Sequence, residues 1–229
     1  MSVTPPIRLI RSFVRRENKL SPKQQQLFNT LWPRYGLNIA AGLIDPIISF
    51  QSQAPLVLEI GFGKGQTLLQ QAQANPDKNY LGIEVYRTGI NALFTQLAEA
   101  PLNNLKIFAE DATDVIPHCI AEQSLSLIQV FFPDPWPKTR HHKRRLMQAA
   151  FIQLLHQKMK PNAQLHIATD CEAYAKQMLQ LLEATTHWQN NTAPQQFSPR
   201  PSDRPLSYFE QRGLALNHQV FNLCFTRNK

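Results

Sequence analysis

Short apolar runs alternate with amphipathic segments along most of this chain, and this alternation restricts its fold more than any other feature. Apolar runs of this length predict buried strands, here at residues 55–60, 80–85, 104–109, 125–132, 164–168 and 220–226. Apolar residues at helical spacing predict helices between them, at residues 66–74, 87–98, 113–120, 144–159 and 171–184. The sequence therefore predicts an α/β fold with a mostly parallel sheet and helices on both faces.

The 229-residue length and the distribution of charge predict one domain with a basic extension. Residues 1–36 hold seven Lys and Arg residues against one acid, Glu17, and four prolines. We therefore expect a basic N-terminal arm over residues 1–36, partly disordered when free, and a single domain over residues 37–229. Such an arm is equally compatible with contact to a polyanion and with a surface tail that has no role.

The net charge of +8 and the pI of about 9.6 favour a polyanionic partner. The three cysteines are far apart and form no CxxC pair, so a disulfide framework or a zinc site is not expected. None of the seven histidines is expected to bind a metal. No secretory signal and no apolar run of about 20 residues is present. A cytoplasmic protein that does not bind membranes is expected.

A carboxylate stands at the end of each of the first five predicted strands: Glu59, Glu84, Asp111, Asp134 and Asp170. In a parallel sheet the carboxyl ends of the strands form the ligand-binding edge. Asp111 and Asp170 are equally well explained as N-caps of the helices that follow them. The five together favour a site that holds a cation, since clustered carboxylates repel one another unless a cation or hydrogen-bond donors are present.

The glycine turn after the first strand, Gly61-x-Gly63-x-Gly65, allows a ligand to approach the backbone closely. The dinucleotide pattern needs a glycine at position 66, where this chain has Gln66, and this disfavours a nucleotide-dependent oxidoreductase. Glu84 follows Gly65 by 19 residues, about the spacing at which an acid binds ribose hydroxyls. S-adenosyl-L-methionine, which combines a ribose with a cationic sulfonium, suits this acidic edge.

The segment VFFPDPWPKTRHHKRR, residues 130–145, combines an anion, an aromatic plane and a run of cations. Asp134 lies between Pro133 and Pro135, which hold it on a stiff turn after the fourth strand. Trp136 can stack on a base or pack over the turn. The cations that follow form a second basic concentration suited to a phosphate backbone.

Six motifs together resemble those of the bacterial tRNA (guanine-N7-)-methyltransferase family: EIGFGKG (59–65), GIEVY (82–86), Asp111-Ala112, FFPDPWPKTRHHKRR (131–145), ATD (168–170) and RPLSYFEQRG (204–213). The resemblance covers nearly the whole chain. It implies the class I methyltransferase fold, a Rossmann-like, mostly parallel seven-stranded sheet. It also implies methyl transfer from S-adenosyl-L-methionine to N7 of guanosine 46 in the tRNA variable loop, with no obligate protein partner.

The resemblance also assigns roles to residues of this chain. Asp134 is implied to be catalytic. The implied cofactor-binding residues are Glu59, Gly61, Gly63, Gly65, Glu84, Asp111, Ala112 and Asp134. The implied substrate-binding residues are Lys138, Asp170, Ser207, Tyr208, Phe209 and Glu210. The implied RNA-binding residues are Arg140, His141, His142, Lys143, Arg144 and Arg145. The chain departs from the family pattern at Tyr208, where a lysine is usual, and at Pro137, where a histidine is usual.

The predicted reaction needs no general base, because guanine N7 carries a lone pair and no proton. We expect Asp134 to position the base and to stabilise the charge that develops on it; the alternative is that Asp134 only organises the cofactor. Two other functions stay open on the sequence: methyl transfer to another RNA or to a protein, and RNA binding without catalysis.

Overall fold

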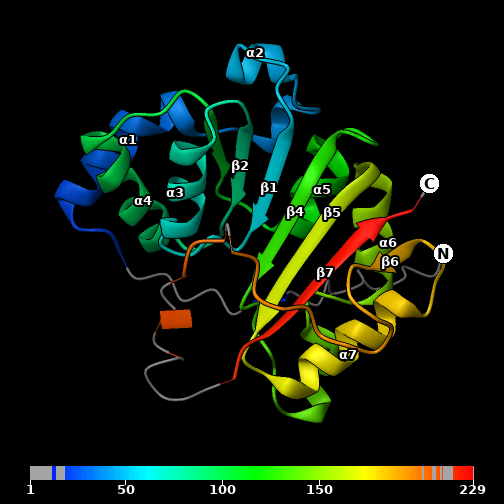
Figure 1. Cartoon of the computed structure of the whole chain (residues 1–229). Coiled ribbons are helices and arrows are strands. Elements are labelled where there is room, and N and C mark those ends of the chain that lie inside the picture. Colours follow the sequence, from blue (N-terminus) through cyan, green and yellow to red (C-terminus); the bar gives the residue numbers. More distant parts are fainter. Residues whose placement is uncertain are drawn as a thin grey trace, which may run out of the picture.

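The computed structural model describes residues 12–13, 19–202, 204–207, 210–211, 213 and 219–228. In this part of the chain seven strands form one sheet in the order β3-β2-β1-β4-β5-β7-β6 (Figure 1). The strands are β1 Leu56–Ile60, β2 Asn79–Ile83, β3 Leu105–Phe108, β4 Leu125–Phe131, β5 Met159–Thr169, β6 Trp188–Asn190 and β7 Phe221–Arg227. β1 to β5 are parallel, whereas β7 runs antiparallel to β5 and β6. The predicted fold class is confirmed.

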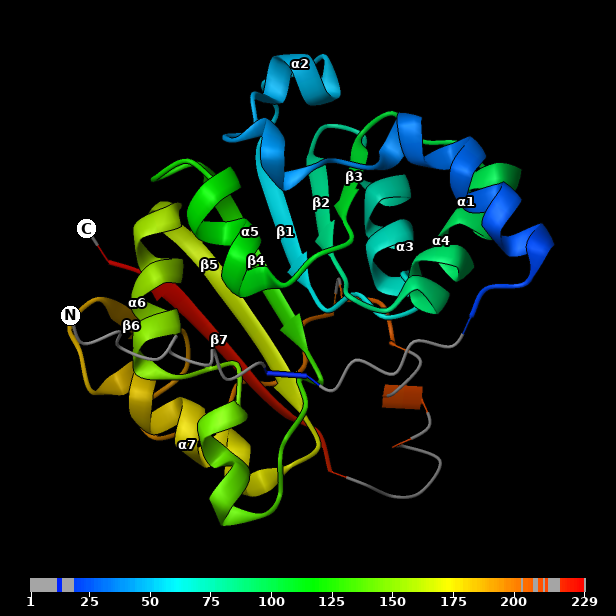
Figure 2. The ribbon, with the colours of Figure 1, turned by 180° about the vertical axis from the view of Figure 1, so that it is seen from behind.

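Helices cover both faces of the sheet. The helices α1 Pro22–Tyr35, α3 Gln66–Ala74 and α4 Arg87–Glu99 share one apolar cluster with the strands, and α5 Ala112–Cys119, α6 Ala149–Lys158 and α7 Glu172–Glu183 share the other. Along β1, Val57 belongs to the first cluster and Leu58 to the second, as expected where side chains alternate across a pleated sheet. α5 and α6 lie behind the sheet in Figure 1 and in front of it in Figure 2.

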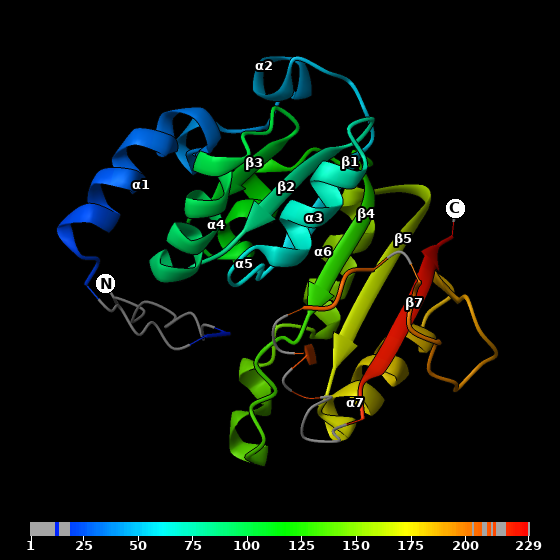
Figure 3. The same cartoon turned by 60° about the vertical axis from the view of Figure 1, so that its left-hand side comes forward.

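The predicted arm over residues 1–36 extends too far into the domain, because residues 22–35 form α1. Ser21 and Gln24 close a capping box at its start, with Pro22 in the first turn. Phe28 stacks on Trp32 with ring centroids 5.0 Å apart and contacts Phe94 of α4 at 5.6 Å. Figure 3 shows α1 outside α4. The basic residues of this segment are interspersed with an apolar stripe, and this stripe makes α1 part of the domain.

The predicted helix over residues 144–159 is wrong in its first turn. The 3₁₀ helix η2, Thr139–Arg144, comes first, and α6 begins only at Ala149. The amide of Met147 donates to the Tyr174 hydroxyl at 3.0 Å, and the side-chain amide of Gln148 donates to the carbonyl of His142 at 2.8 Å. The first of these is a tertiary bond to α7, which no periodicity can predict, and it engages a backbone amide that the predicted helix would have used.

The carboxyl ends of β1 and β4 mark the point where the order of the sheet reverses, because β2 lies on one side of β1 and β4 on the other. The short elements η1 Ile39–Ala41 and α2 Pro46–Phe50 lie near the opposite edge (Figure 1). Ligands of open α/β sheets bind at such a reversal. Among the described helices none is long and apolar enough to cross a membrane.

Candidate functional site

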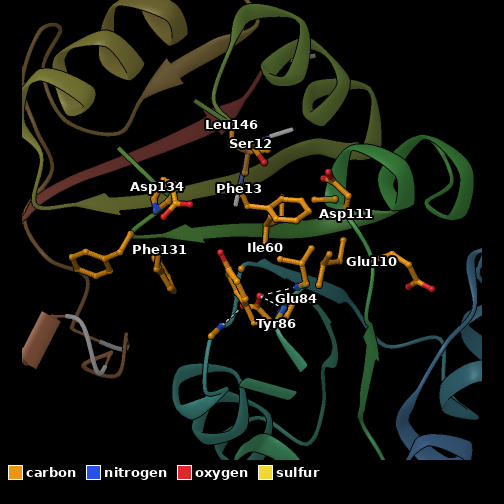
Figure 4. Close-up of a pocket in the computed structure, with 17 residues that line it drawn as sticks. Ser12, Phe13, Ile60, Glu84, Tyr86, Glu110, Asp111, Phe131, Asp134 and Leu146 are labelled. Carbon is orange, nitrogen blue, oxygen red and sulfur yellow. Dashed lines mark hydrogen bonds between the residues drawn. The ribbon is translucent and has the colours of Figure 1, made fainter. Parts of the chain in front are cut away.

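Two adjoining hollows open at the carboxyl ends of β1, β2 and β4. We call the first the acidic hollow; its lining includes Glu84, Asp111, Ala112 and Asp134 (Figure 4). We call the second the turn hollow; its lining includes Glu59, Lys64 and Ser207. Both hollows share Gly61, Gly63, Tyr86, Phe131 and Phe132. Four of the five predicted strand-end carboxylates therefore meet in one place.

Glu84 joins the glycine turn to the start of α4. One carboxylate oxygen accepts from the amide of Gly63 at 2.7 Å, and the other accepts from the amides of Val85 at 2.7 Å and Tyr86 at 3.0 Å. Burial raises the pKa of Glu84, the three amides lower it, and the nearby Asp134 raises it again. Gly63 has a φ of 57°, which few residues other than glycine adopt easily. The turn and Glu84 thus hold each other in place.

Glu59 is an ionisable group buried in the body of the domain. It is 2% exposed, and its Oε2 atom has no hydrogen-bond partner among the described residues. Burial, together with the charge of Glu84, raises the pKa of Glu59 to about 8, although Arg204 acts in the opposite direction. A buried carboxyl in this state needs either a proton or a cationic donor. The turn hollow, which Glu59 lines, is where such a donor can enter.

Asp111 is compatible with both of the roles that the sequence left open. Its Oδ1 atom accepts from the amide of Thr113 at 3.0 Å, so it is the N-cap of α5. It also lines the acidic hollow together with Ala112. Asp111 therefore caps α5 and lines the acidic hollow at the same time.

The turn that carries Asp134 has a backbone in a sparsely populated conformation on both sides. Phe132 has a φ of 52° and Trp136 a φ of 44°. Such conformations cost about 1–3 kcal/mol each and persist only where surrounding contacts impose them. The amide of Phe132 is held by the carbonyl of Ala168 in β5, at 2.8 Å. Asp134 itself is exposed at the acidic hollow.

Trp136 packs over the turn, which is one of its two predicted roles. Its indole NH donates to the carbonyl of Ser12 at 2.8 Å, and the Arg144 guanidinium lies 4.9 Å from its ring centroid. Phe13 meets Tyr86 edge to face, with centroids 6.5 Å apart. Ser12 and Phe13 therefore line the acidic hollow (Figure 4). No pattern in the sequence indicates these contacts, since they join residues that are far apart in the chain.

The six residues predicted to contact RNA do not form one exposed surface. Arg140 and Lys143 are exposed, and His141, His142 and Arg144 are partly exposed. Arg145, by contrast, is 3% exposed, so it is placed too deeply for the predicted phosphate contact. Its Nε atom donates to the carbonyl of Pro135 at 2.8 Å, and its Nη1 atom donates to the side chain of Gln177.

The predicted substrate residues are also divided. Ser207 lines the turn hollow, whereas Lys138 and Asp170 are exposed and lie outside both hollows. Glu210 is 1% exposed, and both of its oxygens accept from Arg204 at 2.7 Å. The carboxylate of Glu210 is therefore occupied by Arg204 inside the protein, and its contact with substrate stays a prediction. Tyr208 and Phe209 lie outside the described residues.

Gly65 has a packing role that the sequence did not reveal. It lies outside both hollows, at the N-cap of α3, with a φ of 73°. A Cβ atom at this position would lie 2.8 Å from the Leu93 side chain of α4. Gly65 is therefore required where α3 meets α4, and the predicted direct contact with the cofactor is not supported by its position.

The two hollows fit S-adenosyl-L-methionine. The Oε2 atom of Glu59, which no described residue contacts by a hydrogen bond, offers a carboxyl oxygen to an ammonium group, and Glu84 lies at the position of a ribose-binding acid. The charge of Glu84 raises the pKa of Glu59, and the charge of Asp134 raises the pKa of Glu84. An acidic rim of this kind accepts a cationic ligand more readily than a pyrophosphate.

A glycine turn and an acidic rim at the reversal point of this sheet define a class I S-adenosyl-L-methionine-dependent methyltransferase. A family model described as "Putative methyltransferase" matches residues 53–223. A solved 16S rRNA (adenine(1408)-N(1))-methyltransferase from Catenulisporales acidiphilia is 18% identical and superposes with a TM-score of 0.56, covering 84% of this chain and 94% of that chain. This likeness supports the fold.

Curated relatives identify the family within that class. A tRNA (guanine-N(7)-)-methyltransferase from Alcanivorax borkumensis is 45% identical over 96% of this chain and 92% of the relative. One from Hydrogenovibrio crunogenus is 46% identical over the same shares. The chain belongs to the tRNA (guanine-N(7)-)-methyltransferase family.

Proposed function

We propose that this chain transfers a methyl group from S-adenosyl-L-methionine to N7 of guanosine 46 in the variable loop of tRNA, in the cytoplasm and without an obligate protein partner. The observation that carries the proposal is the position of Asp134. It lines the acidic hollow and also begins the segment that leads into the exposed cations Arg140 and Lys143. Cofactor and polyanion are thus expected to meet at this turn.

The cofactor is assigned to both hollows by the chemistry of their linings. Glu84, Asp111 and Ala112 suit the nucleoside end, and Glu59 suits the ammonium of the amino acid end. When bound, the cofactor supplies an electrophilic methyl group on a sulfonium. Gly61 and Gly63, which line both hollows, allow the backbone to approach the ligand closely.

The work of the protein residues in this reaction is alignment and stabilisation of charge. Guanine N7 attacks with its lone pair, so no side chain has to remove a proton first. Asp134 is proposed to hold the base in line and to stabilise the positive charge that develops on the ring. Lys138, Asp170 and Ser207 stay as candidates for contacts with the nucleoside and its phosphates.

The proposal is tested by methyl transfer from labelled S-adenosyl-L-methionine to unmodified tRNA, compared with the same tRNA carrying adenosine at position 46. We expect label on the first and none on the second. Equal label on both would retain the methyltransferase and refute the position. Bound cofactor with label on neither tRNA would point to another RNA or to binding without catalysis.

A second prediction concerns the exposed cations of the basic segment. Changing Arg140, Lys143 and Arg144 together to alanine is expected to weaken tRNA binding and to reduce the slope of log K against log salt by about two units, roughly 0.7 for each phosphate that is no longer neutralised. Cofactor affinity is expected to stay unchanged. Filter binding over a salt series measures the tRNA affinity and its slope, and calorimetry measures the cofactor affinity.

The matched control for this variant is Lys160→Ala. Lys160 is an exposed cation at the start of β5, away from the carboxyl ends of the strands. It is expected to leave affinity and slope as in the wild type. Wild-type tRNA affinity in the triple variant would show that this segment does not contact the phosphate backbone.

A further inference from the structure

Arg145 makes a set of contacts that an RNA-binding cation would not need. Beyond its bonds to Pro135 and Gln177, its guanidinium lies 4.7 Å from the ring centroid of Tyr174. Two of its nitrogen atoms are engaged by neutral oxygen atoms, and an aromatic ring covers its plane. With 3% of the residue exposed, Arg145 offers almost no surface to a phosphate oxygen.

The carbonyl that Arg145 holds belongs to the residue directly after Asp134. On the other side of Asp134, the amide of Phe132 is bound to Ala168 of β5. The turn is therefore pinned at both ends, once by the sheet and once by Arg145. Phe132 and Trp136, at the first of these points and directly after the second, have positive φ angles that persist only where surrounding contacts impose them.

The residues of α7 that contact Arg145 are themselves held in place by packing. Tyr174 is fully buried in α7, and its hydroxyl accepts from the amide of Met147. Gln177 lies one turn further along the same helix. Arg145 thus transmits the position of α7, a helix that contributes nothing to the lining of either hollow, to the turn that carries Asp134.

We propose that Arg145 is a positioning residue for Asp134, through the Pro135 carbonyl, and does not contact RNA. This inference rests on the proposed catalytic role of Asp134. A guanidinium is required because its planar fork reaches Pro135 and Gln177 at once, and the lysine ammonium, a point charge on a flexible stem, cannot reproduce that geometry.

The test is Arg145→Lys, because this change keeps the charge and removes the fork. A phosphate contact would largely survive the change, whereas a positioning contact would not. We expect kcat to fall by about 10- to 100-fold, since displacement of a catalytic group by an ångström costs rate on this scale. The Kd for tRNA and its salt slope are expected to stay within about twofold of the wild type.

Gln177→Leu provides a second variant that leaves Arg145 in place and changes no charge. Because Gln177 is only partly buried, the fold is expected to survive. We expect a several-fold lower kcat with unchanged tRNA affinity. Arg227→Lys, which changes a buried arginine at the opposite edge of the sheet, is the matched control and is expected to retain the wild-type kcat.

Two results would overturn the inference. One is a wild-type kcat in both Arg145→Lys and Gln177→Leu; the other is a weaker tRNA affinity with a shallower salt slope in Arg145→Lys at unchanged kcat. Asp134→Asn separates this inference from the proposed function. If Asp134→Asn keeps full turnover, the catalytic role fails first; if it loses turnover while Arg145→Lys does not, only the positioning role of Arg145 fails.

Discussion

Replacing Asp134 by asparagine is expected to lower kcat by about 100- to 1,000-fold, the range found when one group that stabilises transition-state charge is removed. Asparagine keeps the size of the side chain and its ability to accept a hydrogen bond, and it loses the negative charge. Since Asp134 is exposed at the acidic hollow and asparagine has nearly the same shape, the fold is expected to survive.

Single-turnover methyl transfer with saturating cofactor and tRNA is the measurement that isolates this effect. Cofactor affinity, measured by calorimetry, is expected to change by less than about tenfold. The matched control is Asp114→Asn, an exposed acid in α5 outside both hollows, which is expected to react at the wild-type rate.

The rival interpretation, in which Asp134 only organises the cofactor, predicts the opposite effects on cofactor affinity and kcat. Cofactor affinity would fall by a large factor, and kcat at saturation would stay close to the wild type. That outcome would assign the stabilisation of charge to another group at the acidic hollow. Glu84 is the first carboxylate to consider, since the charge of Asp134 raises its pKa.

The convergence of the carboxylates could be predicted from the sequence because it depends on topology alone. Once residues 55–60, 80–85, 104–109 and 125–132 are taken as parallel strands, the acids at their carboxyl ends must share one edge of the sheet. Glu59, Glu84, Asp111 and Asp134 meet as expected. The three-residue strand β6 could not be predicted from the periodicity, because a run of that length carries no periodic signal.

The state of each polar side chain could not be predicted in the same way, because it depends on partners distant in the sequence. Arg144 and Arg145 are adjacent cations, yet the first lies over Trp136 and the second is enclosed by Tyr174 of α7. Glu210 belongs to a family motif, but its carboxylate is bound by the buried Arg204. A motif gives the identity of the residue, and only packing shows whether it faces a ligand or the interior.

The buried Glu59 leads to the second large prediction. Replacing it by glutamine is expected to weaken cofactor binding by about 10- to 100-fold, because a hydrogen bond to a charged group contributes roughly 1.5–3 kcal/mol. The amide is close to isosteric with the protonated carboxyl, so the fold is expected to persist. Glu122→Gln, an exposed change outside both hollows, is the matched control and is expected to bind as the wild type.

The same residue makes cofactor binding depend on pH in a defined direction. With a pKa of about 8, Glu59 carries a proton in most free molecules at pH 7. A bound ammonium favours the carboxylate, so binding at pH 7 is expected to release close to one proton. Affinity should therefore rise with pH, by up to about tenfold per unit below pH 8, and level off above it.

Calorimetry in buffers of different ionisation enthalpy measures this proton release. The cofactor's own amino group also titrates near this range, but its contribution is common to the wild type and to Glu59→Gln, so the difference between the two isolates Glu59. A matching trend is expected in stability: the raised pKa stabilises the fold below about pH 4.5, and this stabilisation is lost as pH rises toward 8. Equal proton release by the wild type and the variant would show that the protonation of Glu59 does not change when the cofactor binds, and it would contradict this prediction.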